Sequence, residues 1–267
     1  MSSTTLTFPA RTAAPSNLTV ITTEIRYEIL RALRTRAFSL STIGFPIMFY
    51  LFFGLLMNRH QNIAAGVSVA KYLLGSYVTF GALGVAIFGI GVGVALDRSA
   101  GWLELKQASP MPPIAYVLSK CSIAVVFSLI IVSALTILGI TLGGVHLSLV
   151  EFVHISTIAA VAAVPFSCLG LAMAFLSPPN AAGGIANLIY LPMSFLSGLW
   201  LPIQFLPHAL QVIAPIFPTY HLAQLMYAAL GAPTQGSALS HWLGVLGFTL
   251  VMLGVTAIAF RRSEQNS

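Results

Sequence analysis

The segment FVHISTIAAVAAVPFSCLGLAMAFL (residues 152–176) opens a stretch that runs to residue 260 without a single Asp, Glu, Lys or Arg. In the whole chain of 267 residues, 7% are charged and 57% are hydrophobic. The surface of a soluble domain carries roughly a quarter or more of its residues as charges. The composition therefore predicts an integral membrane protein, and the few charged residues become the informative ones.

The apolar segments predict membrane-spanning helices. About 20 apolar residues in a helix cross the roughly 30 Å hydrocarbon layer, where backbone groups must be paired within a helix or a closed barrel. The segments lack the alternating pattern of barrel strands, so we expect an all-α fold. A flexible cytoplasmic tail (1–17) would precede one transmembrane domain (18–267). The six expected spans are residues 40–57, 72–96, 114–138, 152–176, 181–201 and 239–260.

The basic residues predict how the chain is oriented. If both termini lie on one side, all 12 Lys and Arg residues except Arg59 and Lys71 fall on that side. Cytoplasmic segments retain Lys and Arg, so both termini are predicted to be cytoplasmic. The net charge of +6 then serves orientation and contact with anionic lipid. We expect no nucleic acid partner.

An amphipathic helix is predicted before the first span, at residues 18–36. Its apolar side chains recur every three or four residues and form one stripe: Leu18, Ile21, Ile25, Ile29 and Leu33. The charged side chains expected elsewhere on the helix are Glu24, Glu28, Arg31 and Arg34. The candidate docking residues are Glu24, Arg26, Glu28 and Arg31. Such a helix lies in the membrane surface. It can serve as an orientation anchor or as a docking helix for a partner.

A second polar segment, DRSAGWLELKQASPMPP (residues 97–113), lies between the second and third spans. It combines charged residues with a Trp–Leu pair, and three prolines close it. A short amphipathic helix on the cytoplasmic side suits insertion into the groove of a partner protein. A plain solvated turn would not need Trp102 and Leu103.

Residues 202–238 are too apolar for an ordinary loop and are divided by four prolines, Pro202, Pro207, Pro215 and Pro218. None of the resulting pieces is long enough to span a membrane. We therefore expect a re-entrant or interfacial helical hairpin on the outer side, packed against the bundle so that its broken backbone is shielded from lipid.

No nucleotide-binding or ion-coupling motif is visible in the sequence. None of its lysines, Lys71, Lys106 and Lys120, follows a glycine as a P-loop requires. No acidic residue lies at mid-depth in a predicted span, where ion-coupled carriers place theirs. The six histidines are expected near the outer side, and none of their spacings indicates a metal-ligand pair. No cofactor site is predicted, and the role of the histidines stays open.

Two motifs now support a family resemblance. The pattern D-R-x-x-G-W-L-E…S-P at residues 97–110 and FLSGLWLPIQFLPHALQVIAPIFPTYHLAQ (residues 195–224) stand in a specific order. Together with the six-span layout, they resemble the permease subunits of type-2 ABC exporters in the bacterial inner membrane. Trp102 occupies a position where that family usually has Thr. Trp is found there in a subgroup resembling antibiotic and lipopeptide exporters.

The resemblance implies partners and site residues. It implies a second permease copy or relative and two cytoplasmic ATPase subunits, which would bind the ATP and Mg²⁺. The amphipathic helix and the polar segment would meet the ATPase. The coupling residues would be Asp97, Arg98, Gly101, Trp102, Leu103 and Glu104. The outer gate would include Gly198, Pro202, Pro207 and Tyr220.

The expected function is therefore outward movement of a hydrophobic or amphipathic solute, such as a drug, an antibiotic or a lipid-like molecule. A secondary carrier or channel that works without an ATPase remains an alternative. An intramembrane enzyme is disfavoured because the sequence offers no cluster of carboxylates for acid–base or metal chemistry.

Overall fold

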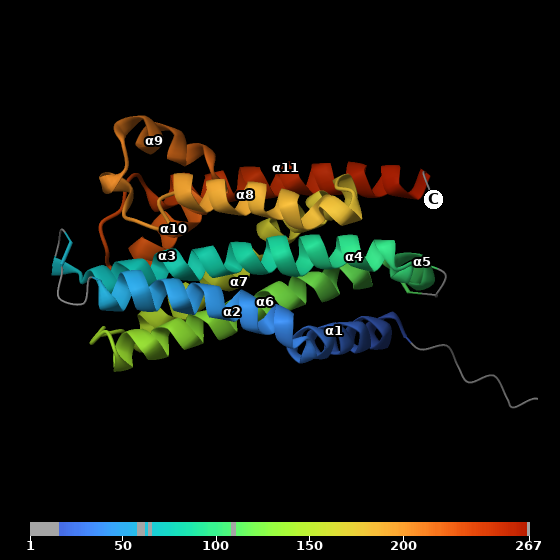
Figure 1. Ribbon diagram of the computed structural model, residues 1–267, viewed down its shortest axis with the longest axis horizontal. Coiled ribbons are helices and arrows are strands. Elements are labelled where there is room, and N and C mark those ends of the chain that lie inside the picture. Colours follow the sequence, from blue (N-terminus) through green and yellow to red (C-terminus); the bar gives the residue numbers. More distant parts are fainter. Residues whose placement is uncertain (1–15, 58–61, 64–65, 108–110, 266–267) are drawn as a thin grey trace, which may run out of the picture.

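The computed structural model describes residues 16–57, 62–63, 66–107 and 111–265. These residues form helices and no β-strand, so the expected all-α class is confirmed. Long helices run side by side along one axis (Figure 1). Most of the predicted tail, residues 1–15, lies outside the described residues. Ser16 caps the first helix by accepting a hydrogen bond from the Thr19 N–H at 3.3 Å.

Five described helices are long and apolar enough to cross a membrane: Arg36–Leu56, Val69–Ser99, Ala115–Thr141, Leu149–Leu176 and Ala238–Arg262. They correspond to five of the six predicted spans and define a multi-pass membrane protein. The first combines α2 (Arg36–Phe49) with the π-helical turn η1 (Tyr50–Leu56). The second joins α3 (Val69–Gly84), η3 (Val85–Val92) and α4 (Gly93–Ser99). The others are α6 (Pro113–Thr141), α7 (Leu149–Leu176) and α11 (Ala238–Gln265).

The six-span count is not confirmed, because the predicted span 181–201 contains a shorter helix. Here η4 (Pro179–Ala181) leads into α8 (Ala182–Leu196), whose 15 residues extend only about 22 Å. The helix ends where the Ser197 hydroxyl bonds back to the Met193 carbonyl. Gly198 follows with φ +74°, a left-handed conformation that favours glycine.

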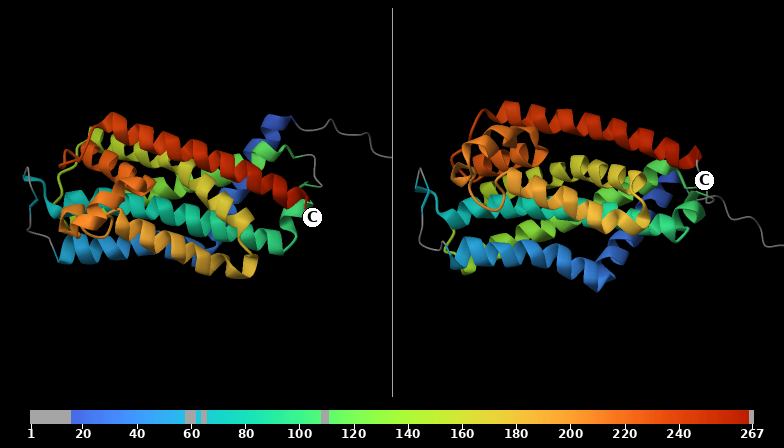
Figure 2. Two further views of the ribbon diagram at one scale, coloured as in Figure 1. Left: turned by 90° about the horizontal axis from the view of Figure 1, so that it is seen from above. Right: turned by 45° about the horizontal axis from the view of Figure 1, so that its top comes forward.

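The predicted amphipathic helix forms as α1 (Asn17–Arg34), and only Thr35 separates it from α2. Figure 2 shows that α1 leaves the axis of α2 at a steep angle and crosses one end of the bundle, where it packs on α6. The same end holds α5 (Trp102–Gln107) and the C-terminal end of α11. We call it the charged end.

The second span is the centre of the bundle. Every α3 residue except Lys71 is buried, and α3 packs on α2, α6, α7 and α10 (Pro218–Ala229). Only 11% of the most apolar stretch of α11 is buried inside the bundle. This fits a helix whose remaining surface faces lipid. The core therefore runs along α3 and η3, with α11 at the periphery.

Glycines allow η3 and α7 to approach each other closely. A Cβ atom added to Gly170 would collide with the Ala86 carbonyl oxygen, and one added to Gly91 would collide with the Met173 side chain. Small residues at such a crossing let two membrane helices pack backbone to backbone. By contrast, a Cβ added to Gly254, on the exposed surface of α11, would meet nothing within 4 Å.

This crossing yields a prediction. Gly170→Ala is expected to destabilise the protein by about 1–3 kcal/mol, because a backbone carbonyl cannot move aside as a flexible side chain can. Gly254→Ala is the matched control and should be neutral or slightly stabilising, since alanine favours the helix. Thermal unfolding of the purified protein in detergent measures both. Equal melting temperatures for the two variants would contradict the close approach.

Prolines divide residues 202–238 as predicted. Pro202 and Pro207 precede η5 (Ile203–Phe205) and α9 (His208–Ile213), while Pro215 and Pro218 lie in the first turns of η6 (Ala214–Ile216) and α10. Figure 1 places α9 and α10 at the end opposite the charged end. We call residues 197–237 the broken segment; its re-entrant position in a bilayer stays a prediction.

Candidate functional site

The predicted coupling residues lie on a sharp elbow at the charged end, between α4 and α5. Gly101 makes the turn with φ +73°, so α5 begins directly after α4 ends. Trp102 and Leu105 project from α5 with 53% and 63% of their surfaces exposed. The side chains of Leu103 and Glu104 lie outside the described residues. The elbow therefore presents an apolar surface that the described part of the chain leaves half uncovered.

A buried carboxylate joins the elbow to α1. Glu28, on α1, is 5% exposed. Its Oε1 lies 2.6 Å from the Lys106 Nζ of α5, and its Oε2 lies 2.8 Å from the Lys120 Nζ of α6. Glu24 pairs with the same Lys106 ammonium at 2.5 Å. Ion pairs thus connect one side of α1 to both α5 and α6.

Asp97, at the end of α4, extends this network. The Arg31 guanidinium donates to both Asp97 oxygens, at 2.5 and 3.3 Å, and Lys120 Nζ lies 3.5 Å from Asp97 Oδ2. Three carboxylates therefore face three cations. We call this group the charge cluster; its members are Glu24, Glu28, Arg31, Asp97, Lys106 and Lys120.

The surroundings of Glu28 and Arg31 favour the charged form of each side chain. Burial alone would raise the pKa of Glu28, but the Lys120 charge and hydrogen bonds from Lys106 and Lys120 outweigh it and lower the pKa from 4.5 to about 2. The hydrogen bond to Asp97 raises the pKa of Arg31. Because each buried charge is compensated by an opposite one, the desolvation cost of burying them is offset.

The geometry corrects one detail of the sequence analysis. Glu28 was expected off the apolar stripe of α1, yet it lies on the buried face, while Leu18 and Leu33 of that stripe are 71% and 41% exposed. The reason is that Lys106 and Lys120, distant in sequence, meet Glu28 inside the bundle. Whether Glu24, Arg26, Glu28 or Arg31 also contacts a partner protein stays a prediction.

Arg98 makes a different connection. Its Nη1 donates to the Ala174 carbonyl of α7 at 2.5 Å, and its guanidinium lies 5.6 Å from the centroid of the Phe175 ring. A carbonyl at a helix C-terminus attracts a cation. The elbow is therefore attached to α7 as well as to α1 and α6.

A cavity of about 250 Å³ lies beside the cluster, between α1, α2, η3, α4 and α6. Its lining combines four charged side chains, Glu28, Arg31, Asp97 and Lys120, with Thr35 and eight apolar residues. The apolar lining is Ala32, Phe38, Phe88, Gly89, Val92, Gly93, Leu96 and Ile123. Such a lining suits a small molecule with one polar end.

The predicted gate residues lie in different environments within the broken segment. Gly198, Pro202 and Tyr220 are buried, whereas Pro207 is exposed. Tyr220 belongs to a small separate core with Ile203, Leu206 and Ala214. Trp200, which the gate prediction omitted, anchors the segment because its ring packs on Phe49 and Phe80.

Two histidines that are distant in sequence meet at this end. His221 Nδ1, on α10, lies 3.0 Å from His241 Nδ1, on α11. His241 Nε2 donates to the Gln235 carbonyl at 2.6 Å, because a carbonyl oxygen can only accept. The sequence spacing gave no sign of the pair. Among the described residues, no group of three His, Cys, Asp or Glu side chains could hold a metal ion.

The histidine pair predicts a pH dependence. Burial and the neighbouring His241 lower the pKa of His221, so the folded protein favours the neutral ring. Stability that depends on the pair is therefore present above the ordinary histidine pKa of about 6.5 and is lost as pH falls below it. We expect the melting temperature in detergent to fall between pH 7.5 and 5.

The control for this prediction is His208, an exposed residue of α9. His208→Gln should keep the pH dependence, and His221→Gln should reduce it. A wild-type melting temperature that does not change over this pH range would contradict the role of the pair.

Comparison with known proteins matches this architecture. The family described as ABC-2 type transporter matches residues 19–231. A protein of Bacillus subtilis (strain 168) named "Putative transport permease YvfS" is 26% identical over 209 residues, which cover 78% of this chain and 84% of that protein. The family match contains most of α1, the elbow and most of the broken segment, and the chain therefore belongs to the ABC-2 type transporter family of membrane permeases.

Proposed function

We propose that this chain is the membrane-spanning permease subunit of an ATP-driven exporter, with both termini in the cytoplasm of a bacterial cell. The observation that carries the proposal is the family match over residues 19–231. ATP and Mg²⁺ would be bound by two separate ATPase subunits, because the sequence contains no P-loop lysine.

The elbow is the proposed contact with the ATPase. Trp102 and Leu105 supply an exposed apolar surface, and Lys106 of the same helix is paired with Glu24 and Glu28 of α1. A displacement of α5 would therefore move α1 through these ion pairs. Asp97 and Arg98 would carry the same displacement to α1, α6 and α7.

The solute is proposed to be hydrophobic or amphipathic. The cavity beside the cluster is lined by both charged and apolar side chains, which supports a solute with a polar and an apolar part that enters from the inner leaflet. The broken segment would close the opposite end of the path. Its own small core around Tyr220 supports movement as a unit.

We further propose that α8 is a sixth, short span and that the permease pairs with a second copy or a relative. Figure 1 shows α8 running along the bundle from the charged end towards α9. A path for a bulky solute, together with two ATPase subunits, requires two such bundles.

Purification of the full chain from its native membranes tests the proposal. An ATP-binding subunit should copurify, and vesicles that contain both proteins should take up a lipophilic fluorescent dye only when ATP is supplied. Vesicles that contain the chain alone and accumulate the dye against a gradient would overturn the proposal in favour of a secondary carrier.

A further inference from the structure

The described cations of α1, α5, α6 and the start of α2 fall into two groups. Arg31, Lys106 and Lys120 are neutralised by carboxylates of the charge cluster. Three other arginines are exposed, and within the described part of the chain no carboxylate pairs with them. They are Arg26, Arg34 and Arg36. The side of α1 that faces the bundle is therefore neutralised, and its uncompensated positive charge lies on the other side.

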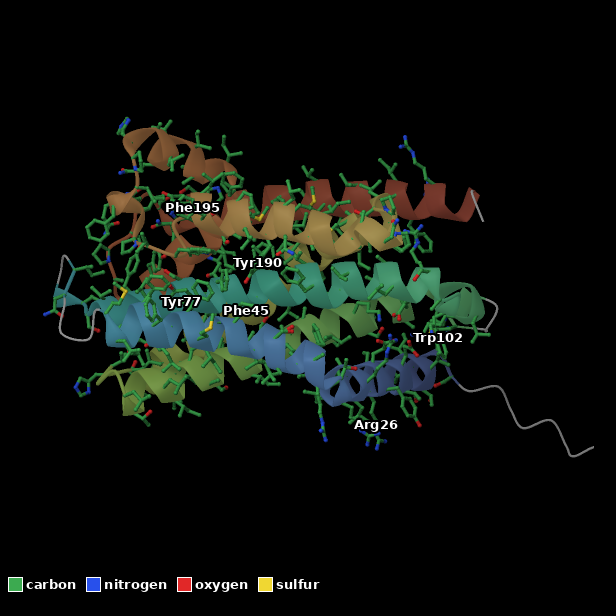
Figure 3. All side chains as sticks on the ribbon, in the orientation of Figure 1. Arg26, Phe45, Tyr77, Trp102, Tyr190 and Phe195 are labelled. Atoms are coloured by element: carbon green, nitrogen blue, oxygen red, sulfur yellow. The ribbon has the colours of Figure 1, made fainter. Side chains whose placement is uncertain are left out.

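The uncompensated side also carries exposed apolar groups. Tyr27 is 66% exposed and Leu33 is 41% exposed. In Figure 3, Arg26 lies on the side of α1 that is turned away from the other helices. We call Arg26, Tyr27, Arg34 and Arg36 the arginine face.

The position of the arginine face along the chain indicates how deep it lies in the membrane. Arg36 is the first residue of the membrane-length helix Arg36–Leu56, and Arg34 stands two residues before it. Leu40, about one turn further, is 76% exposed in this membrane-length helix. Basic and aromatic side chains at the start of a span are typical of the headgroup region, and α1 crosses the end of the bundle as an in-plane helix does.

We infer that the arginine face binds the phosphate groups of anionic phospholipids in the leaflet at the charged end. Guanidinium groups match phosphate oxygens in bidentate geometry, and the apolar neighbours suit the acyl-chain boundary. An acidic protein surface would match the charge alone, whereas the headgroup region of a membrane matches both the charge and the exposed Leu40 at the start of α2. Because the other side of α1 is paired with α5, bound lipid would hold the elbow in place relative to the membrane.

Native mass spectrometry of the full chain in neutral detergent tests this inference, with phosphatidylglycerol and phosphatidylcholine as probes. The wild type should retain phosphatidylglycerol in preference to phosphatidylcholine. In the double variant R26Q/R34Q, affinity for phosphatidylglycerol should fall by about 30-fold, since each surface arginine contributes about 1 kcal/mol to binding anionic lipid. The matched control R261Q/R262Q removes two exposed arginines of the same end that lie on α11, outside the arginine face, and its loss of affinity should be smaller than that of R26Q/R34Q.

Three results would overturn the inference. The first is a wild type without preference for phosphatidylglycerol, and the second is an equal loss in both double variants. The third is an R26Q/R34Q variant that keeps the lipid preference but no longer captures an ATPase subunit, which would assign the face to a protein. The lipid measurement needs no ATPase, so its failure is distinguishable from failure of the proposed function. Both variants should elute as the wild type does, because exposed unpaired side chains contribute little to stability.

Discussion

Substitution of Glu28 by glutamine is expected to destabilise the protein by about 3 kcal/mol, because removing one partner of a buried ion pair leaves the other charge uncompensated. Glu28 contacts both Lys106 and Lys120, and the Lys120 side chain is only 5% exposed. The melting temperature in detergent should fall clearly. The pH dependence has a defined sign: the stabilisation is present above pH 4.5 and is lost as pH falls through about 2.

The control for this prediction is Glu151→Gln at the opposite end. Glu151 pairs with Lys71 at 2.5 Å, but both side chains are about one-fifth exposed, at 23% and 18%. This pair keeps more contact with solvent than the Glu28 pairs, so its loss should cost less, and glutamine can keep the capping interaction with Ser148. The double variant Glu28→Gln, Lys120→Met should recover part of the lost stability. Equal effects of Glu28→Gln and Glu151→Gln would contradict a structural role for the cluster.

Five membrane-length helices could be predicted from the sequence because lipid imposes a simple rule on apolar length. Their observed ends lie within a few residues of the predicted ends, as the span predicted at 152–176 and observed at Leu149–Leu176 shows. The segment 181–201 did not follow the rule. Its apolar residues continue past Leu196, but the left-handed turn at Gly198 ends the helix. A hydropathy pattern contains no information about such a turn.

The pairing of charged groups could not be predicted. The residues that pair with Glu28 and His221 are distant in sequence, and a periodic pattern on one helix says nothing about another helix. The polar segment at residues 97–113 was recognised from its composition, and so was the half-exposed Trp102. What the structure adds is that Asp97 and Lys106 are bound to α1, so the elbow and the amphipathic helix form one unit.

Replacement of Trp102 by alanine is expected to have the largest effect on assembly. Large aromatic side chains at the centre of an interface contribute about 2–4 kcal/mol to binding, which corresponds to roughly 30- to 1,000-fold in affinity. Trp102 is 53% exposed, and within the described part of the chain no aromatic or cation–π partner contacts it. Its removal should therefore weaken capture of an ATPase subunit while the melting temperature of the isolated permease changes little.

The matched control is Trp242→Ala, which removes the same side chain from the start of α11 at the opposite end, where Trp242 is 37% exposed. This variant should bind the ATPase subunit as the wild type does, because α11 begins far from the elbow (Figure 1). Binding is measured by copurification and by titration of the ATPase subunit onto the detergent-solubilised permease. If Trp102→Ala and Trp242→Ala bind equally well, the exposed surface of α5 is not the docking site. The charge cluster would then stabilise the permease without transmitting any displacement from a partner.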